Sequence, residues 1–170
     1  ASAMYFPYLY GRQSELLALR DFAASNPGGN AVSPIVEPVK RNPSGVIRAV
    51  DELSQAGLHP IVILNPSKGE LADTASASSW YSELFASLPV NHNMVPAFLV
   101  TSNESINDVQ AFLSAFPNHN SVVIYRSSHL SDADVHAIDA DPRVGLEVTT
   151  PNSLNPQQRG LVSHFKAVDI

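Results

Sequence analysis

The sequence predicts an α/β protein with parallel strands, in the form of a TIM-like (β/α) barrel. Short apolar segments with strand character alternate along the chain with segments of helical period. The strands recur roughly every 20 to 35 residues, which is the length of a βα unit in such barrels. The segment from Ile61 to Leu64 is apolar on both faces, as expected for a strand covered by helices. About seven strands can be recognised, so we expect an incomplete barrel.

An open doubly wound sheet would show the same alternation of strands and helices. The barrel is favoured because no glycine-rich phosphate loop follows the first strand. The pair Gly28-Gly29 precedes a strand instead of opening a helix, so it is not a nucleotide-binding fingerprint.

The strands are predicted from apolar runs that are rich in β-branched and aromatic residues. The first run is aromatic, and the second ends abruptly in a carboxylate, a proline and an ammonium group. A charge at the C-terminal end of a strand is typical of α/β proteins, where that end opens into the ligand crevice. In chain order the predicted strands are residues 5–10, 32–40, 59–66, 95–101, 121–125, 143–149 and 165–170.

The first three helices are predicted from apolar residues at spacings of three and four. The first begins at Ser14, and the second runs from residues 42–44 to a left-handed cap at Gly57. Residues 67–79 are rich in serine and alanine and predict a long loop, after which a helix begins at Trp80.

The later helices are predicted from residues that can cap a helix N-terminus. Ser105 with Asp108 suits a capping pair, and Pro117 ends that helix. Ser131 begins a short helix, and Asn155 begins a brief last one.

Length and composition predict one domain. The chain has 170 residues, of which 44% are hydrophobic, enough for one substantial core. We expect residues 1–3 to be the remnant of an expression tag, and residues 4–170 to be the N-terminal part of a longer protein. An unpaired barrel edge at the last strand would then bind a protein partner or a second copy of the chain.

Charge and cysteine content exclude several classes of function. Ten Lys and Arg against sixteen Asp and Glu give a formal net charge of −6, so nonspecific nucleic-acid binding is not expected. The absence of cysteine agrees with a reducing compartment. No apolar run approaches the roughly 20 residues that span a bilayer. We therefore expect a cytoplasmic protein without a membrane segment.

The candidate site residues lie at the C-terminal ends of the predicted strands, where barrel enzymes place their chemistry. Side-chain alternation predicts that Glu37 and Glu147 point into the barrel, Glu147 because Val144, Leu146 and Val148 suit the helix side. Glu37 and Glu147 are the candidate catalytic residues. The candidate substrate-binding residues are Arg12, Lys40, Asn65 and Arg126.

Two carboxylates beside an amide and cations could hold a divalent metal, or could serve as acid and base in phosphate-ester hydrolysis. No residue is assigned as a metal ligand, and the cofactor is unknown. The competing interpretation, which we favour, is a buried ion network that joins Glu37 and Glu147 to Arg126 and Lys40 and only stabilises the barrel. Of the six histidines only His129 follows a strand at the same end, so a histidine metal cluster is not expected.

Several segments are similar to a known family. They are Tyr5 to Leu9 with Gly11-Arg12-Gln13, Pro34 to Lys40, Ile63 to Pro66, and His164 to Asp169. In these segments the chain resembles the prokaryotic and phage "beta protein" family. The resemblance implies a barrel-like fold and a role in phage–host conflict, and it implies no particular reaction.

Two classes of function follow. The first is a scaffold, sensing or binding component in phage–host conflict, on the bacterial or the phage side. The alternative is a metal-dependent hydrolase that acts on a phosphate ester or a nucleotide-like substrate at the barrel mouth. The fold class alone does not choose between them.

Overall fold

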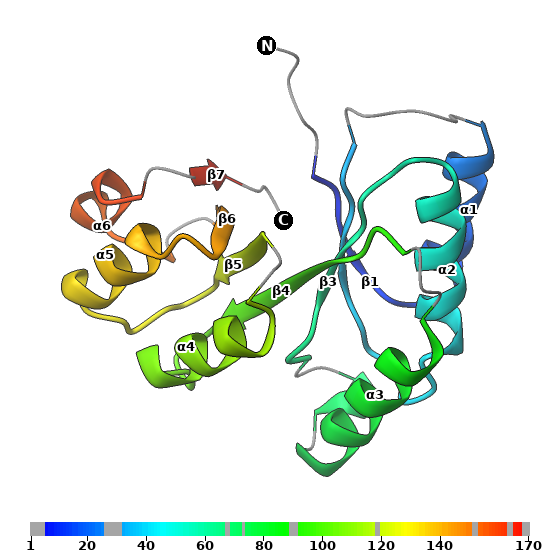
Figure 1. Cartoon of the computed structure of the whole chain (residues 1–170), viewed down its shortest axis with the longest axis horizontal. Helices are drawn as coiled ribbons and strands as arrows, with labels where there is room; N and C mark the ends of the chain where they lie inside the picture. Colours follow the sequence, from blue (N-terminus) through cyan, green and yellow to red (C-terminus); the bar gives the residue numbers. More distant parts are fainter. Residues whose placement is uncertain are drawn as a thin grey trace. The chain divides into compact units, whose positions relative to one another are not determined.

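The computed structural model describes residues 6–25, 32–66, 69–72, 74–88, 92–117, 120–150, 153–162 and 165–167. The chain divides into two compact units, Ala1–Met94 and Val95–Ile170. Within each unit, parallel strands alternate with helices, as the sequence predicts (Figure 1). The α/β class with parallel strands is thus confirmed, whereas the incomplete barrel stays a prediction.

The first unit contains three short parallel strands. β2 pairs with β1 on one side and with β3 on the other. The elements of this unit are β1 (Tyr8–Tyr10), α1 (Gln13–Ser25), β2 (Ile35–Glu37), α2 (Ser44–Gln55), β3 (Ile61–Ile63), the 3-10 helix η1 (Gly69–Leu71) and α3 (Thr74–Ser87).

Helices α1 and α2 lie side by side in the first unit (Figure 1). Gly45 permits this close approach, because an added Cβ at Gly45 would lie 3.1 Å from Leu16 Cδ1. Helix α2 buries the stripe Val46, Ala49, Val50 and Leu53. The helix pair therefore forms one packed layer beside β1 to β3.

The second unit contains four parallel strands, which pair in the order β4, β5, β6, β7. Its elements are β4 (Val95–Val100), α4 (Ile106–Ala115), β5 (Ser121–Tyr125), α5 (Asp132–Ala140), β6 (Val144–Thr149), α6 (Pro156–Gly160) and β7 (Phe165–Ala167). The register between β5 and β6 shifts between Ser121 and Val122, where β6 contributes one extra residue.

The predicted helix starts in the second unit are confirmed. Ser105 and Asp108 form a capping box at the start of α4, and Ser131 accepts a hydrogen bond from the backbone N–H of Asp134. Asn155 caps α6 in the same way. Gly57 in the first unit has φ 81°, the left-handed conformation predicted for the end of α2.

The predicted loop at residues 67–79 is wrong in its second half. Helix α3 begins at Thr74, six residues before Trp80. The segment before Trp80 alternates alanine with serine, and alanine has the highest helix propensity of all residues. The helix was not predicted from the sequence, because the serines between the alanines are also common in loops.

In the part of the chain that the structure describes, none of the helices combines the length and the hydropathy that are needed to cross a bilayer.

Candidate functional site

Arg12 and Lys40, two of the predicted substrate-binding residues, lie in one pocket. The pocket has a volume of about 830 Å³. It is lined by Tyr10, Arg12, Val39, Lys40, Gly69, Glu70 and Ala72. These residues come from the C-terminal end of β1, from the loop after β2, and from η1 after β3. We call this cavity the strand-end pocket, because it lies at the edge of the sheet where α/β proteins bind ligands.

Arg12 is exposed and is held by its neighbour Tyr10. Its guanidinium group lies over the Tyr10 ring, 5.4 Å from the ring centroid, in a cation–π contact. Its backbone N–H donates a hydrogen bond of 2.7 Å to the Tyr10 carbonyl. Arg12 also directly precedes α1, so an anion bound beside it would lie near the positive end of that helix dipole. The contacts with Tyr10 at the strand end thus position one cation at the pocket.

Lys40 forms an ion pair with Glu70. Its Nζ lies 3.2 Å from Glu70 Oε1, and the two side chains are 60% and 51% exposed. Ion pairs with this exposure contribute little to stability, because water and salt screen the attraction. A bound anion can therefore replace Glu70 as the partner of Lys40 at little cost.

Glu70 also ties η1 to the loop after β2. Its backbone N–H donates to the Val39 carbonyl at 2.8 Å, and its Oε2 accepts the backbone N–H of Arg41 at 3.0 Å. The Arg41 N–H and the Lys40 ammonium group hold the pKa of Glu70 below its ordinary value. The charged carboxylate keeps the wall of the strand-end pocket in place.

Glu37, a predicted catalytic residue, is fully buried in β2. The Tyr8 hydroxyl donates a hydrogen bond of 2.5 Å to Glu37 Oε2. The neighbouring Val36 points toward α2, because the methyl groups of Val36 and Val46 approach the same point beside Gly11. By alternation Glu37 points to the other face, as the sequence predicts. Glu37 does not line the strand-end pocket.

Asn65 and Arg126 are not among the residues that line the strand-end pocket. Asn65 is half-buried in the bend after β3 of the first unit. Arg126 is half-buried after β5 of the second unit, and its backbone N–H donates to the Val100 carbonyl at 2.8 Å. A cavity that joins Asn65 and Glu37 to Arg126 would combine residues of both units, and it stays a prediction.

The predicted orientation of Glu147 is wrong. Glu147 in β6 lies next to Val123 of β5, which in turn lies next to Phe98 of β4, so the three side chains share one face of the sheet. The Phe98 ring contacts Phe112 of α4, with centroids 5.2 Å apart. Glu147 therefore lies on the face that carries α4. The prediction failed because alternation shows which residues of a strand share a face, but does not identify the face that the helices cover.

Glu147 belongs to a buried polar network in the second unit. Its Oε1 accepts a hydrogen bond of 2.8 Å from the Tyr125 hydroxyl, and both side chains are fully buried. Burial and a hydrogen bond with the Asp139 side chain of α5 raise the pKa of Glu147 to about 8, against the lowering effect of Tyr125. The network thus connects α5 to β5 and β6. Tyr125 and Asp139 are thus two partners of Glu147, and the expected ion network with Arg126 and Lys40 stays a prediction.

No three His, Asp or Glu side chains among the described residues gather into a group that could hold a metal ion. His129, the histidine predicted at the strand-end face, is exposed after β5. His119 and His164 lie outside the described residues. The catalytic roles of Glu37 and Glu147 stay predictions.

Two residues of these sites were not identified from the sequence: Glu70 and Asp139. Asp139 carried a signal, because it follows the buried Val135 by four residues and so lies on the same side of α5. Glu70 carried none, since its role depends on how η1 packs against the loop after β2.

No family model, no curated protein and no solved structure matches the chain. The resemblance to the beta protein family therefore stays a prediction.

Proposed function

We propose that the chain is a ligand-binding module of the α/β class, and that its first unit binds a small phosphate-bearing anion in the strand-end pocket. One observation carries this proposal: Arg12 and Lys40, which follow two neighbouring parallel strands, line the same pocket. Two cations that converge at the C-terminal edge of a parallel sheet are a common arrangement for holding a phosphate group.

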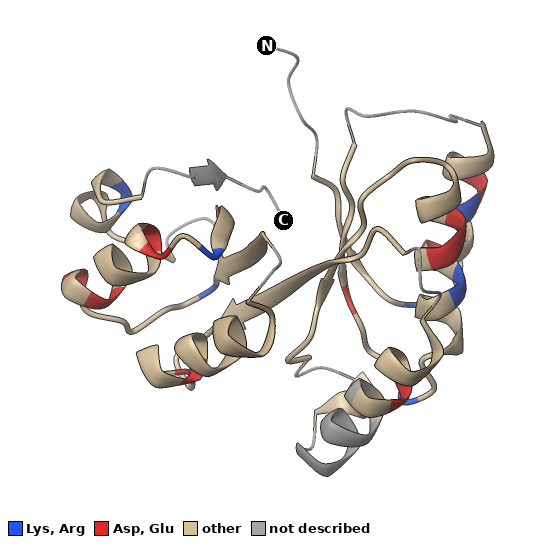
Figure 2. Cartoon of the chain, viewed as in Figure 1, with Lys and Arg blue, Asp and Glu red and all other residues tan. Residues whose placement is uncertain are grey.

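The charges of the pocket favour an anion. Its lining holds two cations, Arg12 and Lys40, and one carboxylate, Glu70. The chain as a whole carries a formal net charge of −6, so the net charge of this pocket is opposite in sign to that of the chain. Figure 2 shows other Lys and Arg residues of the first unit on α1 and α2, among acidic ones. A small anion is therefore drawn to a local site, although the chain repels anions overall.

The chemistry of the two cations suits phosphate. The Arg12 guanidinium can donate two parallel hydrogen bonds to phosphate oxygens, and the Tyr10 ring keeps its plane in place. Lys40 adds a point charge once it exchanges Glu70 for the ligand. A volume of about 830 Å³ lies within the range of about 300–1,000 Å³ that small-molecule sites occupy. The ligand class is a mononucleotide or a sugar phosphate, not a polymer.

The geometry supports binding better than hydrolysis. Both predicted catalytic carboxylates, Glu37 and Glu147, are fully buried, and neither lines the strand-end pocket. A general acid or base must reach the reacting group, directly or through one water molecule. The third carboxylate, Glu70, lines the pocket but is bound to Lys40 and to the backbone of Arg41.

The biological setting in this proposal is phage–host conflict, where the module would sense its ligand. This part rests on the resemblance of residues 5–9, 34–40 and 63–66 to the beta protein family. Phage plating on cells that express the chain tests it. We expect the efficiency of plating to change in cells that express the intact chain. In cells that express Arg12→Gln it should return to the level of the empty vector.

Calorimetric titration with inorganic phosphate and with adenosine monophosphate tests the binding itself. We expect saturable binding that weakens with salt. Arg12→Gln and Lys40→Gln should each weaken it at least about fivefold, as expected when a charge-assisted hydrogen bond of about 1 kcal/mol or more is lost. Arg159→Gln is the matched control, because Arg159 is an exposed arginine on α6 of the second unit. Equal affinities for all four proteins, or no binding, would contradict the proposal.

A further inference from the structure

A second cavity lies between α1 and α2 of the first unit. It has a volume of about 580 Å³, and we call it the helix groove. The residues on which its chemistry depends are Leu16, Leu17, Val46, Arg20, Lys40 and Arg48. It shares Lys40 and Glu70 with the strand-end pocket, but Arg12 lines only that pocket and Arg48 only the groove. The two sites can therefore be tested separately.

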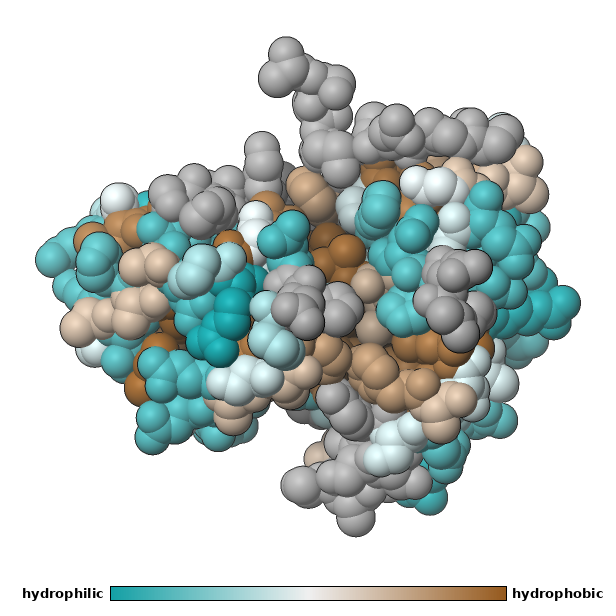
Figure 3. Space-filling view, in the orientation of Figure 1, coloured by the Kyte–Doolittle hydropathy of each residue, from teal (hydrophilic) through white to brown (hydrophobic). Residues whose placement is uncertain are grey.

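The apolar part of the helix groove is centred on Leu17. Leu17 is 43% exposed, and no other large hydrophobic residue among those that the structure describes is exposed. Leu16 and Val46 line the groove beside it and are buried. Figure 3 shows mostly hydrophilic residues along the outer side of α1 and α2. An exposed leucine above buried apolar residues is a suitable contact for one apolar side chain of a partner.

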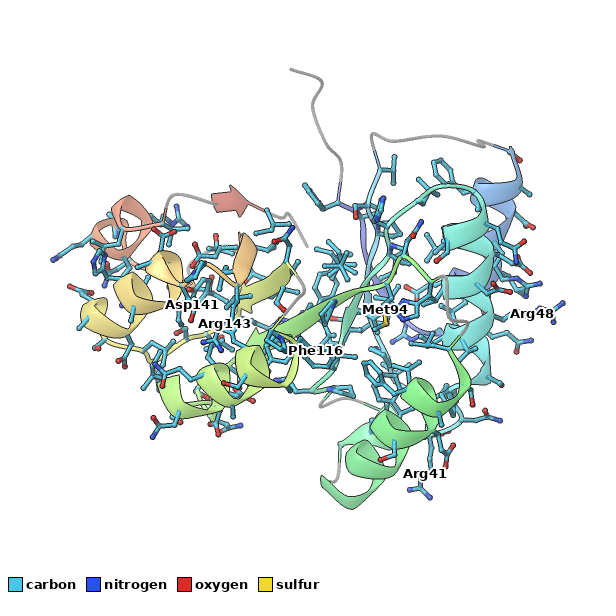
Figure 4. All side chains as sticks on the ribbon, in the orientation of Figure 1. Arg41, Arg48, Met94, Phe116, Asp141 and Arg143 are labelled. Carbon is cyan, nitrogen blue, oxygen red and sulfur yellow. The ribbon has the colours of Figure 1, made fainter. Side chains whose placement is uncertain are left out.

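The polar part of the helix groove is cationic. Arg48 projects from α2 away from the strands (Figure 4), and its side chain is 68% exposed. Arg20 lies across the groove on α1 and pairs with Glu52 at 2.8 Å, and Lys40 lies in the loop before α2. Glu52 Oε1 also lies 3.6 Å from Arg48 Nε, in a longer ion pair. The three cations outnumber the two carboxylates Glu52 and Glu70, so the net charge of the groove is positive. The chain as a whole has a formal net charge of −6.

We propose that the helix groove docks an acidic peptide segment of a partner protein, with an apolar anchor residue against Leu17 and carboxylates facing Arg48 and Lys40. Charge complementarity selects this occupant. A net charge of −6 repels an acidic partner over the molecule as a whole, and the groove attracts it locally. An anchor in an apolar groove with charges around it is a common mode of peptide recognition. This inference does not depend on ligand binding in the strand-end pocket.

Fluorescence anisotropy with a short labelled peptide of alternating glutamate and leucine tests the proposal. We expect saturable binding at low salt that weakens as salt is added. Leu17→Asn and Arg48→Gln should each weaken it at least about fivefold, the effect of losing about 1 kcal/mol at an anchor position. Both side chains are exposed, so we expect unchanged thermal melting of both variants.

The controls separate this site from the strand-end pocket. Arg159→Gln should leave peptide affinity unchanged, and Arg12→Gln should also leave it unchanged while it weakens phosphate binding. No peptide binding, equal binding of a peptide of alternating lysine and leucine, or full affinity in Leu17→Asn and Arg48→Gln would overturn the proposal. Sedimentation that shows self-association lost in Leu17→Asn would assign the groove to a second copy of the chain and would overturn it too.

Discussion

Tyr125 donates a hydrogen bond of 2.8 Å to Glu147 within the buried layer between the sheet and the helices of the second unit. The two residues lie on neighbouring strands, β5 and β6, and Asp139 of α5 acts on the same carboxyl group. A carboxyl group that is buried beside another acid is most stable when it holds a proton. The second unit therefore contains a group that titrates near neutral pH.

The stability of the second unit should depend on pH through Glu147. The pKa of Glu147 is raised from an ordinary 4.5 to about 8, so the folded state holds a proton that the unfolded chain releases in this range. The stabilising contribution is complete below about pH 4.5 and is lost as the pH rises to about 8. Urea unfolding at a series of pH values measures this fall. Glu147→Gln, which stays uncharged, should show a smaller fall, and parallel curves would contradict the assignment.

Tyr125→Phe should shift the same profile toward higher pH. The Tyr125 hydroxyl stabilises the charged form of Glu147 and lowers its pKa, so the pKa should rise further when the hydroxyl is removed. The lost buried hydrogen bond should also cost about 1–3 kcal/mol in the free energy of unfolding. Unfolding of the variant across the same pH range measures both effects. An unchanged pH profile would mean that Tyr125 does not act on Glu147.

Much of this architecture could be predicted from the sequence, because its signals are local. Ser105 with Asp108 and Asn155 with Pro156 predicted two helix starts, since each capping side chain bonds to a backbone N–H only three residues away. The end of α2 at Gly57 was predicted for a similar reason, because a left-handed cap favours glycine. Arg12 and Lys40 were predicted to lie at one edge because parallel strands end on the same side.

The parts that were not predicted depend on packing. The face on which Glu147 lies is set by how β6 aligns with β5, including the register shift between Ser121 and Val122. No local pattern encodes that alignment, since Glu147 and Thr149 alternate with Leu146 and Val148 whichever face the helices cover. Glu70 reaches Lys40 and Arg41 only because η1 packs against the loop after β2. Contacts between loops that are 30 residues apart leave no periodic signal in the sequence.

The hydrogen bond from Tyr8 to Glu37 should stabilise the first unit. Glu37 is fully buried, so Tyr8→Phe leaves a carboxylate oxygen without this donor, and we expect a loss of about 1–3 kcal/mol. Thermal or urea unfolding measures it. Ser102→Ala removes a hydroxyl group from an exposed turn and should have almost no effect. Equal stability of the two variants would show that the bond does not stabilise the fold.

Gly69 should be required for the wall of the strand-end pocket. Its φ is 63°, and an added Cβ would lie 2.5 Å from the Val39 carbonyl oxygen, which accepts the backbone hydrogen bond of Glu70. Gly69→Ala should therefore displace η1, cost about 1–3 kcal/mol and weaken phosphate binding. Gly160→Ala is the matched control, because an added Cβ there meets nothing within 4 Å. Unfolding and calorimetric titration measure the stability and the phosphate affinity of both variants. Equal values for Gly69→Ala and Gly160→Ala would show that Gly69 is not required for this wall.

We propose that a phosphate-bearing ligand binds where Arg12, Lys40 and Glu70 line the strand-end pocket. Amide chemical shifts of the ¹⁵N-labelled chain during titration with adenosine monophosphate locate the ligand most directly. We predict saturable changes at Arg12, Arg41 and Glu70, and their loss in Arg12→Gln, while the amides of α5 and β6 stay unchanged. Changes that are confined to the second unit, or no changes at millimolar ligand, would contradict the claim.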